Sequence, residues 1–216
     1  MVARLRLEVT LPEPRSRTME RMDLRKDWAP LFTARKKPDL IEVPARHAIG
    51  IVETRPPGAE TMGPIFATLY PVAYTLKFAT KAEQAVDYPV LPPEAVFRIA
   101  DFKKPEGWRW MACIAVPDII DAAALRRAVK AVRAKHPETP LLDRVKLVSL
   151  PAGTQARILH VGAYDAEQPT IDRLMAFVRE AGYRAGRHHI EVYLSDPARV
   201  PVERMRTVIR MSVTER

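Results

Sequence analysis

The sequence predicts an α+β fold made of two similar halves. Short apolar runs alternate with helix-period stretches from Pro38 to the end of the chain. One element order (strand, strand, helix, strand, strand) occurs twice, and each copy turns a corner in the same way, at Val43-Pro44-Ala45 and at Leu150-Pro151-Ala152. We therefore expect one domain over residues 38–216, with duplicated halves and two sheets related by a pseudo-two-fold axis.

The first half-repeat covers residues 38–117 and contains one amphipathic helix. Apolar residues at three- and four-residue steps, beginning with Met62 and Ile65, predict this helix over residues 61–79. Pro64 suits its first turn, whereas Pro71 removes a backbone donor from its interior and is expected to kink it. Apolar runs in this half predict strands over residues 39–43, 47–53, 94–100 and 108–116.

The second half-repeat covers residues 143–214 and follows a linking helix over 121–135. Asp121 can cap the linking helix. The second half is expected to contain one helix, over 169–181, and strands over residues 145–150, 155–162, 188–194 and 205–213. Because each module has a helix on one sheet face only, the two uncovered faces are expected to meet around a central ligand cleft.

More than half of the net charge of +9 lies in the first 37 residues. This segment contains ten Lys/Arg and five Asp/Glu, a net charge of +5, and the rest of the chain carries the other +4 with both signs interspersed. A nucleic-acid-binding surface concentrates its charge on one folded face, so nucleic acid is not an expected partner. Residues 1–37 lack sustained periodicity and are expected to be a partly disordered N-terminal extension. Its apolar cluster of Trp28, Leu31 and Phe32 could still pack on the domain.

Several common kinds of site are absent from the sequence. The eight glycines form neither G-x-G-x-x-G nor a P-loop, and there is no H-E-x-x-H and no serine in G-x-S-x-G. No cofactor is expected, and no metal site either, since the adjacent His188 and His189 point to opposite faces of a strand. The single cysteine, Cys113, excludes an internal disulfide, and no apolar run is long enough for a membrane span. We therefore expect a cytoplasmic protein.

The predicted strand over 188–194 carries the strongest candidate for a functional site. Its even-numbered residues are mostly apolar and are expected to face the helix, which leaves His189, Glu191 and Tyr193 on the other face. A carboxylate with an imidazole and a phenol at two-residue steps has two hydrogen-bonding neighbours and is suited to act as a base or an acid. The same pattern also fits a solvated sheet face.

Two further candidates each have a structural alternative. The strand over 108–116 is apolar on both faces, so Trp110 belongs either to the core or to a wall of the cleft. His160 lies in an apolar strand and is either a ligand-binding residue or a buried histidine with satisfied hydrogen bonds.

Two segments of the second half resemble motifs of the GyrI-like small-molecule-binding family. Residues 158–165 are similar to its ILHxGxYD stretch, and residues 188–197 to its H-x-E-I-Y-L-S-D-P segment. The resemblance extends over about residues 24–216. It is nearest to the stand-alone members, since the first 37 residues are too short for a winged helix-turn-helix. It implies duplicated strand-helix-strand-strand modules with pseudo-two-fold symmetry around a central ligand cleft for hydrophobic, often cationic or polycyclic compounds.

The resemblance also implies roles for individual residues. Some stand-alone members are cyclopropanoid hydrolases, and by position Glu191 would be the acid/base residue, with Tyr164 and Tyr193 as hydrogen-bonding groups. The family often has Trp where this chain has Phe97, which keeps the ring but loses the indole donor. The walls of the cleft would be supplied by Tyr74, Glu94, Phe97 and Trp110.

Three functions stay open at this point. The protein is a hydrolase of strained electrophiles, a drug or metabolite sensor or sequestering protein without turnover, or an interaction protein that modulates DNA gyrase, as some relatives imply. A carboxylate in an aromatic cleft serves a cationic ligand as well as it serves catalysis. A homodimer is a further arrangement that the sequence leaves open.

Overall fold

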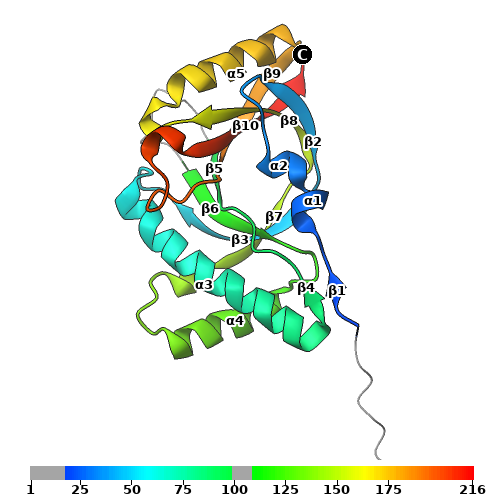
Figure 1. The fold of residues 1–216 in the computed structure, drawn as a ribbon, viewed down its shortest axis with the longest axis vertical. Helices are drawn as coiled ribbons and strands as arrows, with labels where there is room; N and C mark the ends of the chain where they lie inside the picture. Colours follow the sequence, from blue (N-terminus) through cyan, green and yellow to red (C-terminus); the bar gives the residue numbers. More distant parts are fainter. Residues whose placement is uncertain (1–17, 99–108) are drawn as a thin grey trace, which may run out of the picture.

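An eight-stranded antiparallel sheet forms the centre of the fold (Figure 1). We describe it from a computed structural model, which describes residues 18–98 and 109–216. The strand order is β2-β8-β10-β9-β5-β6-β3-β7, and the predicted α+β class is confirmed. The strands are β2 (Asp39–Val43), β3 (Arg46–Glu53), β5 (Glu94–Arg98), β6 (Arg109–Val116), β7 (Lys146–Leu150), β8 (Gly153–Val161), β9 (Tyr183–Tyr193) and β10 (Arg206–Glu215).

The pairing of β5 with β9 joins the two halves of the chain into one sheet. Glu94 is paired with Val192 at one end of this ladder and Arg98 with His188 at the other. The prediction of two sheets is therefore wrong for the described residues of these halves. The outermost strands are exchanged as well, since β2 of the first half pairs with β8 and β7 of the second half pairs with β3. In chain order, β2, β3, β5 and β6 of the first half correspond to β7, β8, β9 and β10 of the second half. When each strand is exchanged for its counterpart, the order of the sheet is the same read from either edge, as expected of a duplication. Superposition of residues 39–117 on 145–213 stays a prediction.

Three long helices accompany the sheet: α3 (Ala59–Gln84), α4 (Ala122–Lys135) and α5 (Gln168–Glu180). The linking helix begins as predicted, because the Asp121 carboxylate accepts a hydrogen bond of 2.6 Å from the Ala124 N–H. The helix α3 is longer than the predicted 61–79 and continues through Pro71. The missing donor removes one hydrogen bond, and we attribute the helix's continuity to its buried apolar face, which includes Leu69 and Val72.

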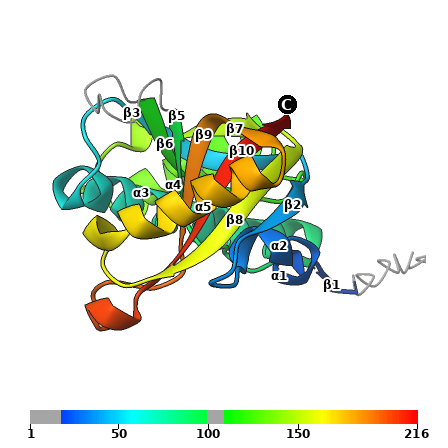
Figure 2. The same ribbon diagram turned by 90° about the horizontal axis from the view of Figure 1, so that it is seen from above.

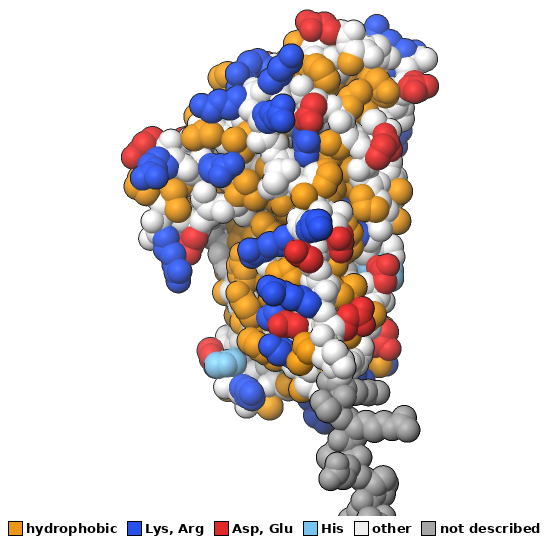
Figure 3. Space-filling model, turned by 45° about the vertical axis from the view of Figure 1, so that its right-hand side comes forward, with side chains coloured by type: hydrophobic (Ala, Val, Ile, Leu, Met, Phe, Trp, Pro, Cys, Tyr) orange, Lys and Arg blue, Asp and Glu red, His pale blue; other side chains and the backbone are white. Residues whose placement is uncertain are grey.

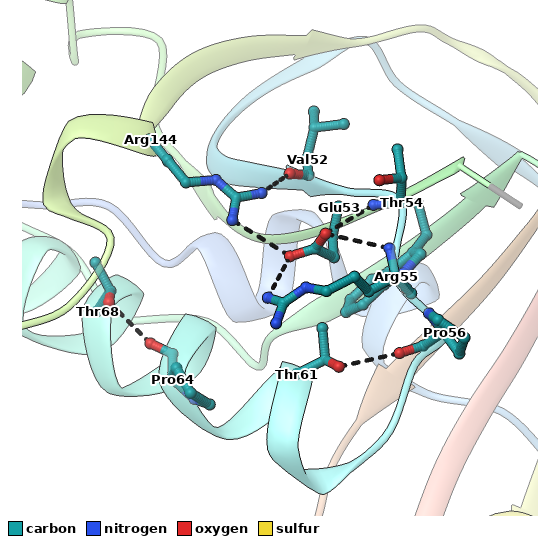
Figure 4. Close-up of polar contacts among 10 residues, drawn as sticks. Val52, Glu53, Thr54, Arg55, Pro56, Thr61, Pro64, Thr68 and Arg144 are labelled. Carbon is teal, nitrogen blue, oxygen red and sulfur yellow. Dashed lines mark hydrogen bonds and ion pairs between the residues drawn. The ribbon is translucent and has the colours of Figure 1, made fainter.

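A polar cluster around Glu53 fixes the loop between β3 and α3 (Figure 4). The buried Glu53 carboxylate accepts from the backbone N–H groups of Thr54 and Arg55 and from the Arg55 and Arg144 guanidinium groups. These donors, the Arg55 side chain first, hold the pKa of Glu53 far below its usual range against the effect of burial. The Thr61 hydroxyl donates to the Pro56 carbonyl at 3.0 Å. The start of α3 is thereby held in place beside the sheet.

Helices α3 and α5 pack on the same face of the sheet, α3 on β3 and β6 and α5 on β8 and β9 (Figures 1 and 2). Ile209 of β10 is in one cluster with Leu174 of α5, and Ile209 is directly paired with Glu191. Paired residues of an antiparallel ladder lie on the same face, so Glu191 is on the helix side. The prediction that the even-numbered residues of 188–194 face the helix is wrong. Tyr183 at the start of β9 packs against the α5 cluster, whereas the end of this strand stays open.

The segment before residue 38 forms part of the core. It contains β1 (Glu20–Arg21), which pairs with β4 (Val86–Asp87), and the short helices α1 (Leu24–Asp27) and α2 (Ala29–Phe32). Leu24, Leu31 and Phe32 are buried in the main cluster, and Arg157 donates from Nη1 to the carbonyl groups of Pro30 (2.6 Å) and Thr33 (2.8 Å). The apolar cluster of this segment therefore packs on the domain, and the folded unit begins before residue 38. Of the predicted partly disordered extension over residues 1–37, residues 1–17 lie outside the described residues.

Charged side chains of both signs are interspersed on the face shown in Figure 3. No single basic patch dominates this face. Within residues 18–98 and 109–216, no helix is both long and apolar enough to cross a membrane.

The docked N-terminal segment generates a prediction about stability. Leu31→Ala removes a side chain that is 1% exposed, and we expect it to lower the free energy of unfolding by about 2–5 kcal/mol. Urea unfolding followed by circular dichroism measures this change, with Lys26→Ala on the exposed side of α1 as the control. Equal stability of the two variants would show that the segment is not part of the core.

Candidate functional site

A cleft of about 1000 Å³ opens on the helix side of the sheet, between α3 and the turn that leads into α5. That turn is the short helix η3 (Tyr164–Ala166). The floor is formed by side chains of β5 and β9, and the walls by α3 on one side and by η3 and the residues after β9 on the other. The lining includes Met62, Phe66, Tyr70, Tyr74, Phe97, Tyr164, Asp165, Glu167, Glu191, Tyr193 and Asp196.

One wall of the cleft is a stripe along α3. Met62, Phe66, Tyr70 and Tyr74 follow one another at four-residue steps, which places them on one side of the helix. Phe66 meets the Tyr193 ring edge to face, with ring centroids 5.9 Å apart. Burial, followed by the nearby Tyr74 and Asp196, raises the pKa of Tyr70, so this phenol stays protonated. The stripe therefore offers flat apolar surface with hydroxyl groups.

Glu191 is the best-positioned carboxylate in the cleft. Its Oε1 accepts a hydrogen bond from His189 Nε2 at 2.9 Å, and its Oε2 accepts one from the Tyr193 hydroxyl at 2.7 Å. The side chain is 16% exposed, so it keeps access to the cleft. Burial, and next the negative charge of Glu191, raises the pKa of Tyr193 well above its usual value. The predicted grouping of His189, Glu191 and Tyr193 on one face is thus present, with real hydrogen bonds between them.

Glu167 is a second carboxyl in the cleft, and the sequence did not identify it. Its residue is 4% exposed, and its Oε1 is buried without a hydrogen bond of normal geometry among the described residues. Burial first, and then the charge of Glu191, raises its pKa to about 8, while the Thr207 hydroxyl acts in the opposite direction. A carboxyl in a turn has no periodicity that could reveal it. The only signal was its position just before the start of a helix at Gln168-Pro169.

The cleft is acidic although the protein as a whole is basic. Its lining contains four carboxyl groups, those of Asp165, Glu167, Glu191 and Asp196, and one basic residue, Arg25. A concave site with an excess of one charge raises the local concentration of ligands of the opposite charge. The site thus combines aromatic walls with a preference for positive charge.

Glu94 does not belong to the cleft, and its predicted role as a wall is wrong. It is paired with Val192, which puts it on the opposite sheet face from Glu191. There it is fully buried and forms ion pairs with Arg46, at 2.9 Å, and with Arg210. Two guanidinium groups around one carboxylate mark Glu94 as a structural charge that ties β3, β5 and β10 together.

Trp110 and His160 also have structural positions. Trp110 is 2% exposed, stacks on Phe97 with ring centroids 5.7 Å apart, and donates from its indole N–H to the Arg55 carbonyl at 2.8 Å. It is paired with Phe97, so it lies beside the floor on the same sheet face. It is not among the residues that line the cleft, and its predicted place in the wall is wrong. His160 is 5% exposed and has partners at 3.0 Å on both ring nitrogens, the Thr170 hydroxyl and the Ala163 carbonyl. It holds the turn before α5 and does not line the cleft.

The other predicted residues do meet around the cleft. Tyr74 is 46% exposed and lies on α3, and Phe97 lies in the floor. Tyr164 is 40% exposed and packs edge to face on Tyr193, with ring centroids 5.4 Å apart. Burial, then the charges of Glu167 and Glu191, raises the pKa of Tyr164, so its hydroxyl remains a donor.

Comparison with known proteins identifies the family of this chain. The sequence model of the GyrI-like small molecule binding domain matches residues 36–214. The chain belongs to the GyrI-like family. The resemblance inferred from residues 158–165 and 188–197 is thereby confirmed. No curated protein matches the chain.

Solved structures show the same GyrI-like fold. A crystal structure of a hydrolase from Listeria innocua shares 26% identity, with a TM-score of 0.78, and covers 90% of this chain and 100% of its own. An uncharacterized conserved protein from Listeria innocua shares 27% identity with a TM-score of 0.80, over 89% of this chain and 100% of its own. The C-terminal domain of EcmrR has a TM-score of 0.57 at 16% identity, over 83% of this chain and 98% of its own, and shows the fold alone.

The position of Glu94 leads to a stability prediction. Glu94→Gln leaves two buried guanidinium groups without their counter-charge, and we expect a loss of about 3–5 kcal/mol in the free energy of unfolding. Urea titration measures it, with the exposed Glu203→Gln as the control. A variant that keeps its stability but loses ligand binding would contradict this structural role and show that Glu94 belongs to the cleft wall.

Glu167 leads to a prediction about pH. Its folded pKa of about 8 lies above the usual 4.5, so the native state holds the proton more tightly, and stability is lost as pH rises from about 4.5 to 8. Glu167→Gln cannot ionise. We expect its stability relative to the wild type to increase between about pH 5 and pH 9, by up to about 4 kcal/mol. Thermal unfolding of both proteins at several pH values measures this. A stability difference between variant and wild type that does not change with pH would contradict the burial of a protonated carboxyl.

Proposed function

We propose that the cleft binds flat aromatic small molecules and hydrolyses one that carries a strained, electrophilic ring, with Glu191 as the general base. The observation that carries this proposal is the Glu191 carboxylate, held by His189 and Tyr193 on the floor of an aromatic cleft. A general base must be fixed within reach of the water that it deprotonates. The structural similarity to a protein described as a hydrolase supports the proposal.

The substrate class follows from the walls of the cleft. Aromatic side chains on both sides, such as Phe66 and Tyr164, favour a planar ligand. A cyclopropane conjugated to a ring carbonyl, as in cyclopropanoid natural products that alkylate DNA, combines a flat body with a carbon that water can attack. Removal of such compounds would serve detoxification.

The ring opening adds one water molecule across a C–C bond of the cyclopropane. The water oxygen bonds to the cyclopropane CH₂ carbon, and Glu191 takes the water proton. The C–C bond of the ring breaks, and its electron pair moves through the conjugated system to the carbonyl oxygen, which becomes a phenol after protonation. A hydrogen-bond donor at that oxygen lowers the barrier. The Tyr193 hydroxyl already donates to Glu191. Tyr164, which packs on Tyr193, is the phenol that we assign to the substrate oxygen.

A second candidate is ligand binding without turnover. Even with Glu167 protonated, the other three carboxyl groups of the lining, against one Arg25, favour this alternative for a cationic aromatic ligand. Such a ligand would gain from cation–π contact with the walls and from the charge of Glu191. The protein would then act as a sensor or a sequestering protein.

One experiment separates the two candidates. Wild type and Glu191→Gln are incubated with a cyclopropane-bearing alkylating compound, and the hydrated product is followed by mass spectrometry. Glutamine keeps the shape of the side chain but cannot accept a proton, so we expect turnover to fall by about 10²–10⁴-fold with little change in substrate affinity. The exposed Glu203→Gln is the matched control.

Two results would contradict the proposal. Turnover that is unchanged in Glu191→Gln would show that Glu191 is not the general base. A wild type without turnover, whose affinity for a cationic dye falls on Glu191→Gln, would favour the binding protein.

A further inference from the structure

We infer that Glu167 is the proton donor of the cleft: it holds a proton that it gives to the oxygen of the bound molecule, while Glu191 acts as the base. The inference rests on the proposed function for the reaction that it serves. The location of the proton on Glu167 is argued separately, from the residues that surround this side chain.

The backbone of Glu167 is fixed, and its carboxyl is not used for the helix that follows. The Glu167 carbonyl accepts from the N–H groups of Thr170 (2.9 Å) and Ile171 (3.0 Å) in the first turn of α5. The residue occupies the N-cap position of α5, yet its side chain makes no capping hydrogen bond. A carboxylate at a helix N-terminus can be stabilised by the free N–H groups of the first turn. Here it lines the cleft instead.

The groups that face Glu167 favour its neutral form. In addition to burial, the negative charge of Glu191 of β9 raises the pKa of Glu167. In addition to burial, the charge of Glu167 in turn raises the pKa of the phenols of Tyr193 (β9) and Tyr164 (η3). β10 contributes the uncharged Thr207. Within residues 18–98 and 109–216, no ion pair joins Glu167 to a lysine, arginine or histidine.

Two basic side chains that contact the first turn of α5 have other partners. On α5, Arg173 donates from Nη2 to the Thr170 hydroxyl at 3.3 Å. On β8, His160 is engaged by Thr170 and Ala163 at both ring nitrogens. Neither compensates a charge on Glu167, so an ionised Glu167 would be a buried charge without a partner.

The hydrogen bonds decide which of the two carboxyls keeps the proton. Glu191 receives two donors, His189 Nε2 and the Tyr193 hydroxyl, which stabilise its ionised form. Glu167 receives none of normal geometry on Oε1. Like charges in one site do not both ionise readily, so the proton goes to the group with fewer donors. The raised pKa of Glu167 agrees with this order.

This division of roles completes the proton balance of the ring opening. The water proton goes to Glu191, and the oxygen that receives the electron pair takes its proton from Glu167. The enzyme is left with a protonated Glu191 and an ionised Glu167. Exchange of one proton with water at each group restores the starting state. Two carboxyl groups with different environments are a common way to place an acid and a base in one site.

The first experiment needs no ligand. The side-chain carboxyl ¹³C signals of uniformly labelled protein are followed by NMR between about pH 4 and pH 10 in the wild type, in Glu167→Gln and in Glu203→Gln. We expect one glutamate to titrate near pH 8, and this signal to be absent only from Glu167→Gln. Titration of every glutamate below about pH 6, or a high titration that persists in Glu167→Gln, would overturn the inference.

The second experiment tests the chemical step. We expect wild-type kcat/KM for the cyclopropane substrate to fall above about pH 8, as Glu167 ionises. Glu167→Gln should lose about 10²–10⁴-fold in rate and lose this alkaline decline. An unchanged pH profile in the variant would contradict the role as donor. Absence of wild-type turnover would remove the proposed hydrolysis, but the NMR titration would still locate the proton.

Discussion

The fold and its cleft both depend on the ladder between β5 and β9. Here the halves meet in the middle of the sheet, while the pairs β2–β8 and β3–β7 join them again near its two edges. Helices α3 and α5 pack on the same face but on different parts of the sheet. The cleft lies beside α3, over the end of this ladder, where Phe97 and Glu191 form its floor. Without this junction there would be no shared floor for the two walls.

The same ladder separates two kinds of carboxyl group. Glu94 and Glu191 lie on neighbouring strands but point to opposite faces of the sheet. Glu94 is surrounded by guanidinium groups in the core and stabilises the packing of strands. Glu191 is held by an imidazole and a phenol and keeps an open side. Their surroundings, and not the residue type, decide which one is available to a ligand.

Local patterns in the sequence predicted most of the elements and part of the site. Alternation placed His189, Glu191 and Tyr193 together, and the capping role of Asp121 was evident from its position. Alternation defines two faces but does not say which one a helix covers, so the side on which Glu191 lies could not be predicted. The partners of Glu94 are distant in the sequence, and Glu167 lies in a turn without periodicity. These features exist only in the assembled sheet.

The exchange of the outermost strands makes folding a property of the whole chain. β2 ends at Val43 but finds its partner in β8, which ends at Val161. The last strand, β10, lies between β8 and β9 in the interior of the sheet. Closure of such long loops slows folding. During synthesis on the ribosome, the first half emerges before β8 and β9, the partners of its strands β2 and β5. The ten-residue strand β10 must then leave the exit tunnel before the sheet and its cleft can form.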